Sequence, residues 1–217
     1  MNKKNSSQKI KAVVFDIGGV LLFPKEKNKP SHILNSFTEA LKLSKLVKMH
    51  DEAKVEAVRD IYFKSSRGEI SKKQTLRLLS DETGIKENKI ENVFHEIYKK
   101  GKTIENSPLL KFTKQLKRIG YKLGIITDQW HLSSEDLVYS GDYSHFDSIV
   151  VSSDAKAKKP NEKPYLIAIK RLKVKPKEII FVDDMVRNIK PAKKFGMKTI
   201  LFKNNKQFFK DIKKFNL

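Results

Sequence analysis

The chain has 217 residues, with 46 Lys or Arg against 25 Asp or Glu, and its formal net charge at pH 7 is +21. Its 39% of hydrophobic residues can form one sizeable core, and the sequence contains no apolar run of the ~18 residues that would cross a membrane. The absence of cysteine excludes disulfides and thiolate metal sites and fits a reducing, cytoplasmic setting.

The positive charge is carried mainly by lysines that are spread over all the predicted helices. The sequence has no dense basic arm with interleaved aromatic residues, so we expect a solvated basic surface and keep nucleic-acid binding as the less favoured alternative. The polar segment 1–9 is not followed by the apolar stretch of a secretory signal, and we expect no membrane partner. A surface this basic attracts anionic substrates, an effect that added salt weakens. The oligomeric state is left open.

The first predicted strand, 12–15, is short and apolar, and a carboxylate, Asp16, follows it directly. Gly18 and Gly19 come next, and two glycines let a ligand approach the backbone closely. In parallel sheets ligands bind at the carboxyl ends of the strands. This stretch is therefore the first candidate for a binding site.

Residues 24–105 show helical periodicity and no strand-like run, which predicts a helical insertion after the first strand. Ser71 and Gln74 have the spacing of a capping box, and Gly84 is expected to end that helix. The turn 65–71 contains Arg67, which either faces the site or is an ordinary surface residue. The apolar positions that mark the four expected helices are Ile33, Phe37 and Leu41; Val55, Val58 and Tyr62; Leu76 and Leu79; and Ile90, Phe94 and Ile97, with Gly101 after the last.

From residue 121 onward, predicted strands alternate with helices, and one more predicted helix precedes them. Ser107 and Pro108 are expected to start a helix, as N-cap and first helical residue, and Gly120 to end it. Alternating strands and helices are typical of a parallel sheet, so we predict an α/β fold, with a Rossmann-like core (1–23 and 106–217) and an inserted all-helical cap domain (24–105). The remaining predicted strands are 123–126, 148–151, 179–182 and 199–202, and a last helix carries Phe208, Ile212 and Phe215 on one face.

Chemically active residues follow three of these later strands. Thr127 and Asp128 follow the second, Lys158-Lys159-Pro160 comes after the third, and Asp183-Asp184 ends the fourth, with Asn188 four residues further on. Because parallel strands place their carboxyl ends at one edge of the sheet, we expect these groups to meet Asp16 there.

Such a cluster has a specific chemistry. Converging carboxylates repel each other unless a cation lies among them, and an all-oxygen set of ligands favours Mg²⁺. Asp16 then keeps one oxygen free to attack, while Lys159 and the hydroxyl of Thr127 hold the oxygens of a phosphoryl group. Each residue also has an ordinary structural explanation, as a turn residue, a strand end or a helix cap. Their joint occurrence, in this order and at consecutive strand ends, favours the functional interpretation.

Four segments resemble the four motifs of the haloacid dehalogenase-like (HAD) hydrolase superfamily, in its helical (C1-type) cap subgroup, and the resemblance covers nearly the whole chain. They are FDIGGVL (15–21), IITD (125–128), KKPN (158–161) and FVDDMVRN (181–188). The resemblance implies that Asp16 is a nucleophile that forms an aspartyl-phosphate. It also implies that Thr127 binds phosphate and that Lys159 steadies the nucleophile and the phosphoryl charge.

The same resemblance implies a Mg²⁺ site. Asp16, the backbone carbonyl of Gly18 and Asp184 are expected to hold the ion, with Asp183 assisting and Asn188 behind them. Two further residues are expected to contact the substrate, Asp128 in the second motif and Arg67 in the cap.

One position departs from the family pattern. Phosphatases of this superfamily usually carry a second Asp two residues after the nucleophile, as general acid and base, and this chain has Gly18 there. General acid–base assistance is worth about 10²–10⁴ in rate, so turnover is expected to be slow unless another group substitutes. His131, close after the second motif, is one candidate proton carrier, and a solvent-facing loop histidine is the alternative.

The function predicted from these residues and the resemblance is a Mg²⁺-dependent phosphatase acting on a small phosphorylated metabolite, such as a sugar phosphate or a nucleotide. One alternative is a low-activity binding or regulatory protein that keeps the fold but lacks the second Asp at Gly18. The other is a haloacid dehalogenase, a chemistry that needs no cation.

Overall fold

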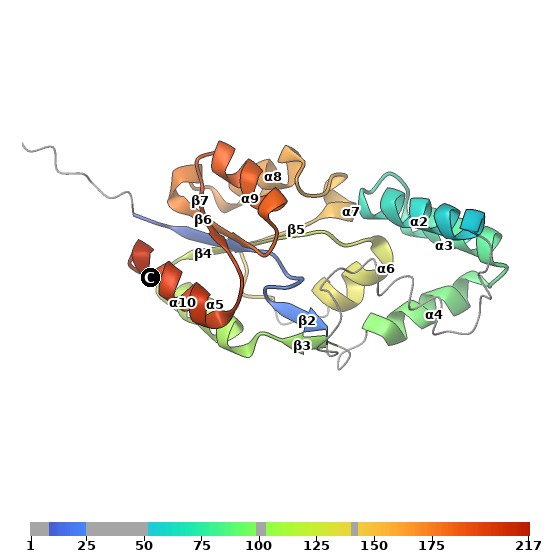
Figure 1. The fold of residues 1–217 in the computed structure, drawn as a ribbon, viewed down its shortest axis with the longest axis horizontal. Coiled ribbons are helices and arrows are strands. Elements are labelled where there is room, and N and C mark those ends of the chain that lie inside the picture. The colour runs from blue at the N-terminus through green and yellow to red at the C-terminus, as the bar shows by residue number, and fades with distance from the viewer. Residues whose placement is uncertain (1–8, 25–51, 99–102, 140–142) are drawn as a thin grey trace, which may run out of the picture.

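A computed structural model describes residues 9–24, 52–98, 103–139 and 143–217 (Figure 1). Its centre is a five-stranded sheet in the order β5-β4-β1-β6-β7, in which all neighbouring strands are parallel. The predicted α/β class and all five predicted strands are confirmed. The strands are β1 (Ala12–Phe15), β4 (Lys122–Thr127), β5 (Ser148–Val151), β6 (Ile179–Asp183) and β7 (Lys198–Leu201).

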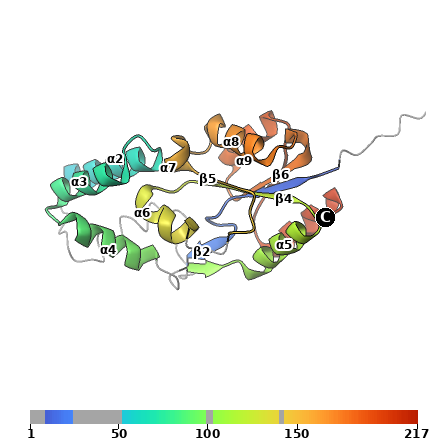
Figure 2. The same cartoon turned by 180° about the vertical axis from the view of Figure 1, so that it is seen from behind.

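Helices cover both faces of this sheet, with α8 (Glu162–Leu172) and α9 (Val186–Lys194) on one face and α5 (Ser107–Arg118) and α10 (Asn205–Ile212) on the other (Figures 1 and 2). Side chains alternate along β1, so Ala12 and Val14 belong to the apolar cluster under α8 and α9. Val13 and Phe15 belong to the second cluster, under α5 and α10. Because both faces are buried, β1 is apolar at every position, as expected for a central parallel strand.

Three helices lie between β1 and β4 in the described part of the insertion, α2 (Glu52–Ser66), α3 (Lys72–Thr83) and α4 (Glu87–Tyr98). The predicted capping box of Ser71 and Gln74 is present, and Gly84 ends α3 in the left-handed conformation. The expected helix with Ile33, Phe37 and Leu41, and the stop at Gly101, fall outside the described residues.

The inserted helices pack on the core through Trp130, which follows β4 and is fully buried. Its ring centroid lies 5.3 Å from that of Tyr62 on α2 and 4.8 Å from that of Phe94 on α4. Aromatic pairs at these separations are favourable contacts, so the strand that carries Thr127 is joined directly to the insertion.

The prediction that residues 24–105 contain no strand is wrong at both ends of that range. β2 (Leu22–Pro24) and β3 (Thr103–Glu105) form a two-stranded antiparallel sheet, in which Leu22 pairs with Glu105 and Pro24 with Thr103. Strands of three residues are too short to show an alternating pattern, and each depends on a partner about eighty positions away in sequence. The predicted domain boundaries fall within or next to this pair.

The start of α5 also differs from the prediction, because its N-cap is Asn106 rather than Ser107. The Asn106 side chain is used elsewhere: its amide nitrogen donates to the carbonyl of Val20 at 2.8 Å and to Oδ1 of Asn205 at 2.9 Å.

Shorter elements complete the chain: α6 (His131–Ser134), a π-helical turn (Glu135–Tyr139), α7 (Ser152–Ala155) and two 3-10 turns (Pro176–Glu178 and Lys213–Phe215). None of the helices in the described ranges is both long and apolar enough to cross a membrane.

Candidate active site

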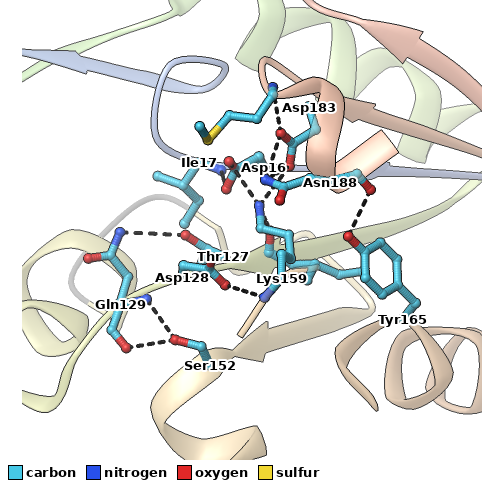
Figure 3. A network of polar contacts seen from close by, with 12 residues as sticks. Asp16, Ile17, Thr127, Asp128, Gln129, Ser152, Lys159, Tyr165, Asp183 and Asn188 are labelled. Carbon is cyan, nitrogen blue, oxygen red and sulfur yellow. Dashed lines mark hydrogen bonds and ion pairs between the residues drawn. The ribbon is translucent and has the colours of Figure 1, made fainter. Parts of the chain in front are cut away.

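Three of the predicted residues lie together at the carboxyl edge of the sheet (Figure 3). Asp16 follows β1, Asp183 ends β6, and the backbone amide of Asp16 donates to the carbonyl of Val182 at 2.9 Å, which continues the pairing of the two strands. Lys159 reaches both carboxylates from the segment after α7. Asp16, Lys159 and Asp183 are all buried, at 8%, 2% and 0% exposure. Buried charges need partners, so the position of each group depends on the others.

Lys159 is the centre of this cluster. Its Nζ lies 2.7 Å from Oδ2 of Asp183 and 2.9 Å from Oδ2 of Asp16, and it donates to the carbonyl of Ile126 at 3.0 Å. An ammonium has three hydrogens to donate, and these three oxygens use all of them. Burial alone would lower the pKa of Lys159, but the carboxylates of Asp16, Asp183 and Asp128 outweigh burial and raise that pKa. Lys159 is therefore charged at neutral pH.

The carboxyl group of Asp16 is under opposing influences. Burial raises its pKa, the Lys159 ammonium lowers it, and the nearby charges of Asp183 and Asp128 raise it again, with a net increase. Its Oδ1 accepts a hydrogen bond from the amide of Ile17 at 2.7 Å while Oδ2 contacts Lys159. The two contacts fix the orientation of the carboxylate at the end of β1.

Asp184 joins Asp16 and Asp183 in an acidic cluster, with one carboxylate oxygen of each residue within 4.8 Å of the others. Three carboxylates this close together repel one another, and a cation among them relieves that repulsion. The donor atoms are all hard oxygens, without the nitrogen or sulfur that zinc prefers, so these residues fit a magnesium ion.

Asn188 supports this cluster from the first turn of α9. Its Nδ2 donates to both oxygens of Asp183, at 3.0 and 3.1 Å, and Oδ1 of Asp183 also accepts from the amide of Met185 at 2.8 Å. Oδ1 of Asn188 is buried and has no hydrogen-bond partner within the described part of the chain. An orphaned buried acceptor is costly, and a water held by a nearby cation would satisfy it.

Gly18, the position of the expected second Asp, is partly exposed and has room for a side chain. A Cβ added there would meet no heavy atom of the described structure within 4 Å, and its φ lies outside the left-handed region. The backbone at position 18 therefore accepts a Cβ without strain. The role of the Gly18 carbonyl as a metal ligand stays a prediction.

Thr127 is 1% exposed at the end of β4, next to a polar network that sequence reasoning missed. Nε2 of Gln129 lies 3.5 Å from Oγ1 of Thr127, while Oε1 of Gln129 accepts from Ser133 at 2.7 Å. The backbone of Gln129 exchanges two hydrogen bonds of 3.0 Å with the hydroxyl of Ser152 (Figure 3). The amide of Gln129 is thus fixed as a donor toward Thr127, which leaves the single hydrogen of the Thr127 hydroxyl free for another acceptor. No spacing in the sequence distinguishes Gln129 from an ordinary loop residue.

The remaining predicted residues lie at different places around this cluster. Asp128 is half-buried, and its Oδ1 accepts a hydrogen bond from the backbone amide of Lys159 at 2.9 Å, which braces the lysine segment (Figure 3). Burial raises the pKa of Asp128, against the opposing charge of Lys159. Arg67 forms two contacts with Glu69, at 2.5 and 3.1 Å, on the surface of the insertion.

His131 contacts the insertion. Its Nε2 lies 3.1 Å from the carbonyl of Ile70, and its backbone amide donates to the hydroxyl of Ser65 at 3.4 Å. A carbonyl only accepts hydrogen bonds, so Nε2 carries a proton in this contact. The imidazole therefore links α6 to the turn after α2.

The comparison with protein families agrees with this geometry. A family model described as "Haloacid dehalogenase-like hydrolase" matches residues 13–202. The chain is 31% identical to rat (Rattus norvegicus) bifunctional epoxide hydrolase 2 over 114 residues, which are 50% of this chain and 21% of the rat protein. It is 36% identical to the glyceraldehyde 3-phosphate phosphatase of Methanocaldococcus jannaschii over 97 residues, 42% of this chain and 41% of that protein. The chain thus spans less than half of the length of either relative.

Solved structures share the fold. A HAD family enzyme from Bacteroides thetaiotaomicron superimposes with a TM-score of 0.74 over 94% of this chain and 99% of that one, at 16% identity. Another structure of the same enzyme, with a TM-score of 0.68 at 16% identity over 90% of this chain and 95% of that one, is described as a complex with magnesium and inorganic phosphate. At 16% identity this similarity establishes the fold alone, and the chemistry is argued from the residues of this chain.

Proposed function

Because the chain belongs to the haloacid dehalogenase-like hydrolase family, we propose that it is a Mg²⁺-dependent phosphatase of small phosphorylated metabolites, such as sugar phosphates or nucleotides, which acts through an aspartyl-phosphate on Asp16. The observation that carries this proposal is the buried Lys159 ammonium, 2.9 Å from Asp16 and 2.7 Å from Asp183 within a cluster of three carboxylates. An arrangement that gathers so much buried charge is costly for folding, and phosphoryl transfer is the chemistry that uses it.

In the proposed reaction an oxygen of Asp16 attacks the phosphorus, and the bond from phosphorus to the leaving oxygen breaks. Lys159 stabilises the negative charge of the phosphoryl oxygens, and the Thr127 hydroxyl donates to one of them. Solvent protonates the leaving oxygen, because Gly18 carries no acid. A water molecule then attacks the phosphorus of the aspartyl-phosphate, which releases inorganic phosphate and restores the Asp16 carboxylate.

Asp16, the Gly18 carbonyl and Asp184 would hold the metal, with Asp183 assisting through its contacts to Asn188. A Mg²⁺ ion held there would neutralise negative charge on the phosphoryl group. The clustering of Asp16, Asp183 and Asp184 supports the two carboxylate ligands of this set. The family membership and the phosphatase among the relatives support the reaction class.

The test is phosphate release from a panel of phosphorylated metabolites, with Mg²⁺ and with excess chelator. We expect release that requires Mg²⁺ and that falls by at least about 10³-fold in Asp16→Asn, because the amide is no nucleophile. Asp81→Asn, which removes one exposed carboxylate on α3, serves as the matched control and should keep the parent rate.

Two results would contradict the proposal. Release of halide from a haloacid in excess chelator would identify a dehalogenase. No release from any metabolite, by a folded protein that still binds Mg²⁺, would favour the binding or regulatory protein that Gly18 suggests.

A further inference from the structure

Gln129 is a fully buried polar residue two positions after Thr127. Its backbone is held independently of its side chain: the Gln129 amide donates to the Ser152 hydroxyl at 3.0 Å, and that hydroxyl donates to the Gln129 carbonyl at 3.0 Å. Ser152 directly follows β5, whose last residue, Val151, pairs with Thr127. An apolar side chain of the same length would fill this position without the cost of burying an amide, so packing alone does not account for a glutamine here.

The side-chain amide of Gln129 has a defined orientation. Its Oε1 lies 2.7 Å from the hydroxyl oxygen of Ser133 on α6. This separation is typical of an O–H···O bond, whereas N–H···O bonds are usually about 2.9–3.0 Å long. Ser133 therefore donates to Oε1, and the NH₂ group of Gln129 is the part of the amide that faces Thr127 (Figure 3).

This orientation decides the role of the Thr127 hydroxyl. Nε2 of Gln129 lies 3.5 Å from Oγ1 of Thr127, at the outer limit of a hydrogen bond. Hydrogen bonds in catalytic sites are often long before the substrate binds and shorten in the complex. An NH₂ group only donates, so Oγ1 is the acceptor in this contact and the one hydrogen of the hydroxyl points elsewhere. Thr127 is thus prepared to donate to an anion.

We propose that Gln129 is a positioning residue of the phosphoryl site: its Nε2 donates to Oγ1 of Thr127 and so turns the hydroxyl hydrogen of Thr127 toward a phosphoryl oxygen. This inference rests on the proposed function, in which Thr127 holds that oxygen. Ser133, Gln129 and Thr127 then form one chain of hydrogen bonds that ends on the substrate, and successive bonds in such a chain polarise and strengthen one another.

Gln129→Met tests this role, because methionine keeps the length of the side chain and removes the amide. Ser133 retains an acceptor in the variant, the carbonyl of Trp130 at 3.2 Å. Phosphorus NMR titration of the full chain with inorganic phosphate, in the presence of Mg²⁺, measures the affinity of the site without turnover. We expect Gln129→Met to bind phosphate about tenfold more weakly than the parent. Gln115→Met, the same substitution at an exposed position of α5, is the matched control and should keep the parent affinity.

A double-mutant cycle separates positioning from packing. Thr127→Val removes the hydroxyl and keeps the shape of the side chain. In this background Gln129→Met should change the phosphate affinity by less than about twofold, because the amide no longer has a hydroxyl to orient. In the Thr127→Ser background, which keeps the hydroxyl, Gln129→Met should again weaken phosphate binding. A role in packing alone would give the same loss of affinity in all three backgrounds.

Equal phosphate affinity of the parent and Gln129→Met would overturn the positioning role, and so would an undiminished loss in the Thr127→Val background. Phosphate release from metabolites is measured separately. A parent that binds phosphate through Gln129 but releases none would overturn only the phosphatase assignment and leave the positioning role standing. Phosphate release combined with a phosphate affinity that does not depend on Gln129 would do the reverse.

Discussion

The backbone carbonyl of Ser153 occupies the space that a side chain on Gly68 would need. A Cβ at residue 68 would lie 2.0 Å from that oxygen and 3.2 Å from Cα of Lys156, and Gly68 has φ of +65°. The turn after α2 thus rests directly on α7 of the core, a few residues before Lys158. Both the contact and the left-handed conformation require glycine here.

Gly68→Ala is therefore expected to destabilise the protein by about 3 kcal/mol or more, because backbone atoms must move apart. Gly84→Ala is the matched control: its φ is +70°, but an added Cβ meets nothing within 4 Å in the described structure, so only the conformational cost of about 1–2 kcal/mol applies. Urea unfolding of both variants measures the difference. Equal losses of unfolding free energy in the two variants would show that the contact with Ser153 adds nothing to the cost of Gly68→Ala.

Asp16→Asn is expected to stabilise the protein against unfolding when no divalent cation is present. Burial raises the pKa of Asp16 in the folded state. The protonated carboxyl therefore makes its full contribution to stability below the ordinary pKa of an aspartate, near 3.9. That contribution is lost as the pH rises through the raised pKa. Asparagine does not titrate. The stability advantage of the variant should therefore be absent at acid pH and grow as the pH rises.

Urea unfolding of the parent and of Asp16→Asn between pH 4 and pH 8, with chelator, measures how this stability advantage changes with pH. Lys159 keeps its 2.7 Å contact with Asp183 in the variant, so the ammonium is not left unpaired. An advantage that shrinks toward neutral pH would mean that the paired Asp16 carboxylate stabilises the fold. Asp81→Asn again controls for the loss of one negative charge.

Magnesium is expected to raise the unfolding midpoint of the parent protein. An ion that binds only the folded state adds about 2.7 kcal/mol at a concentration 100 times its Kd. Asp184→Asn should remove most of this gain at little cost to the metal-free protein, because Asp184 is only half-buried. Sodium chloride at matched ionic strength controls for general screening, and an undiminished magnesium effect in the variant would exclude Asp184 as a ligand.

Gly18→Asp is expected to increase the turnover of phosphate monoesters, by up to about 10²-fold, because a carboxyl at this position can protonate the leaving oxygen. A Cβ added to Gly18 meets no heavy atom of the described structure within 4 Å, so the first atom of the new side chain has room. Gly18→Asn fills the same space without a titratable group and should give no increase. A comparable increase in both variants would attribute the effect to packing rather than to proton transfer.

The sheet and its acidic edge could be predicted from the sequence because their signals are local. Val13, Val14 and Phe15 form a continuous apolar run. Asp16 follows them directly, and a carboxylate is seldom buried unless it has a partner. The capping box of Ser71 and Gln74 depends on residues only three apart, and the structure shows both of its hydrogen bonds. Each of these patterns lies within a single strand or helix and the residues next to it.

Other features depend on partners far away in sequence. β2 and β3 pair across the whole insertion, and Asn106 bonds to Val20 and Asn205 instead of capping its own helix. Gln129 and Ser152 face each other only because β4 and β5 are neighbours.

The short ladder of β2 and β3 has a consequence for how such a chain can be altered. Pro24 and Thr103 are paired, so the polypeptide leaves the sheet and returns to it at one point. A few linker residues would be enough to bridge that gap, and the entropic cost of closing a loop there depends only weakly on its length. Inserts of other lengths can therefore be joined at this junction, provided that they cover Trp130, which packs on Tyr62 and Phe94 of the present insertion.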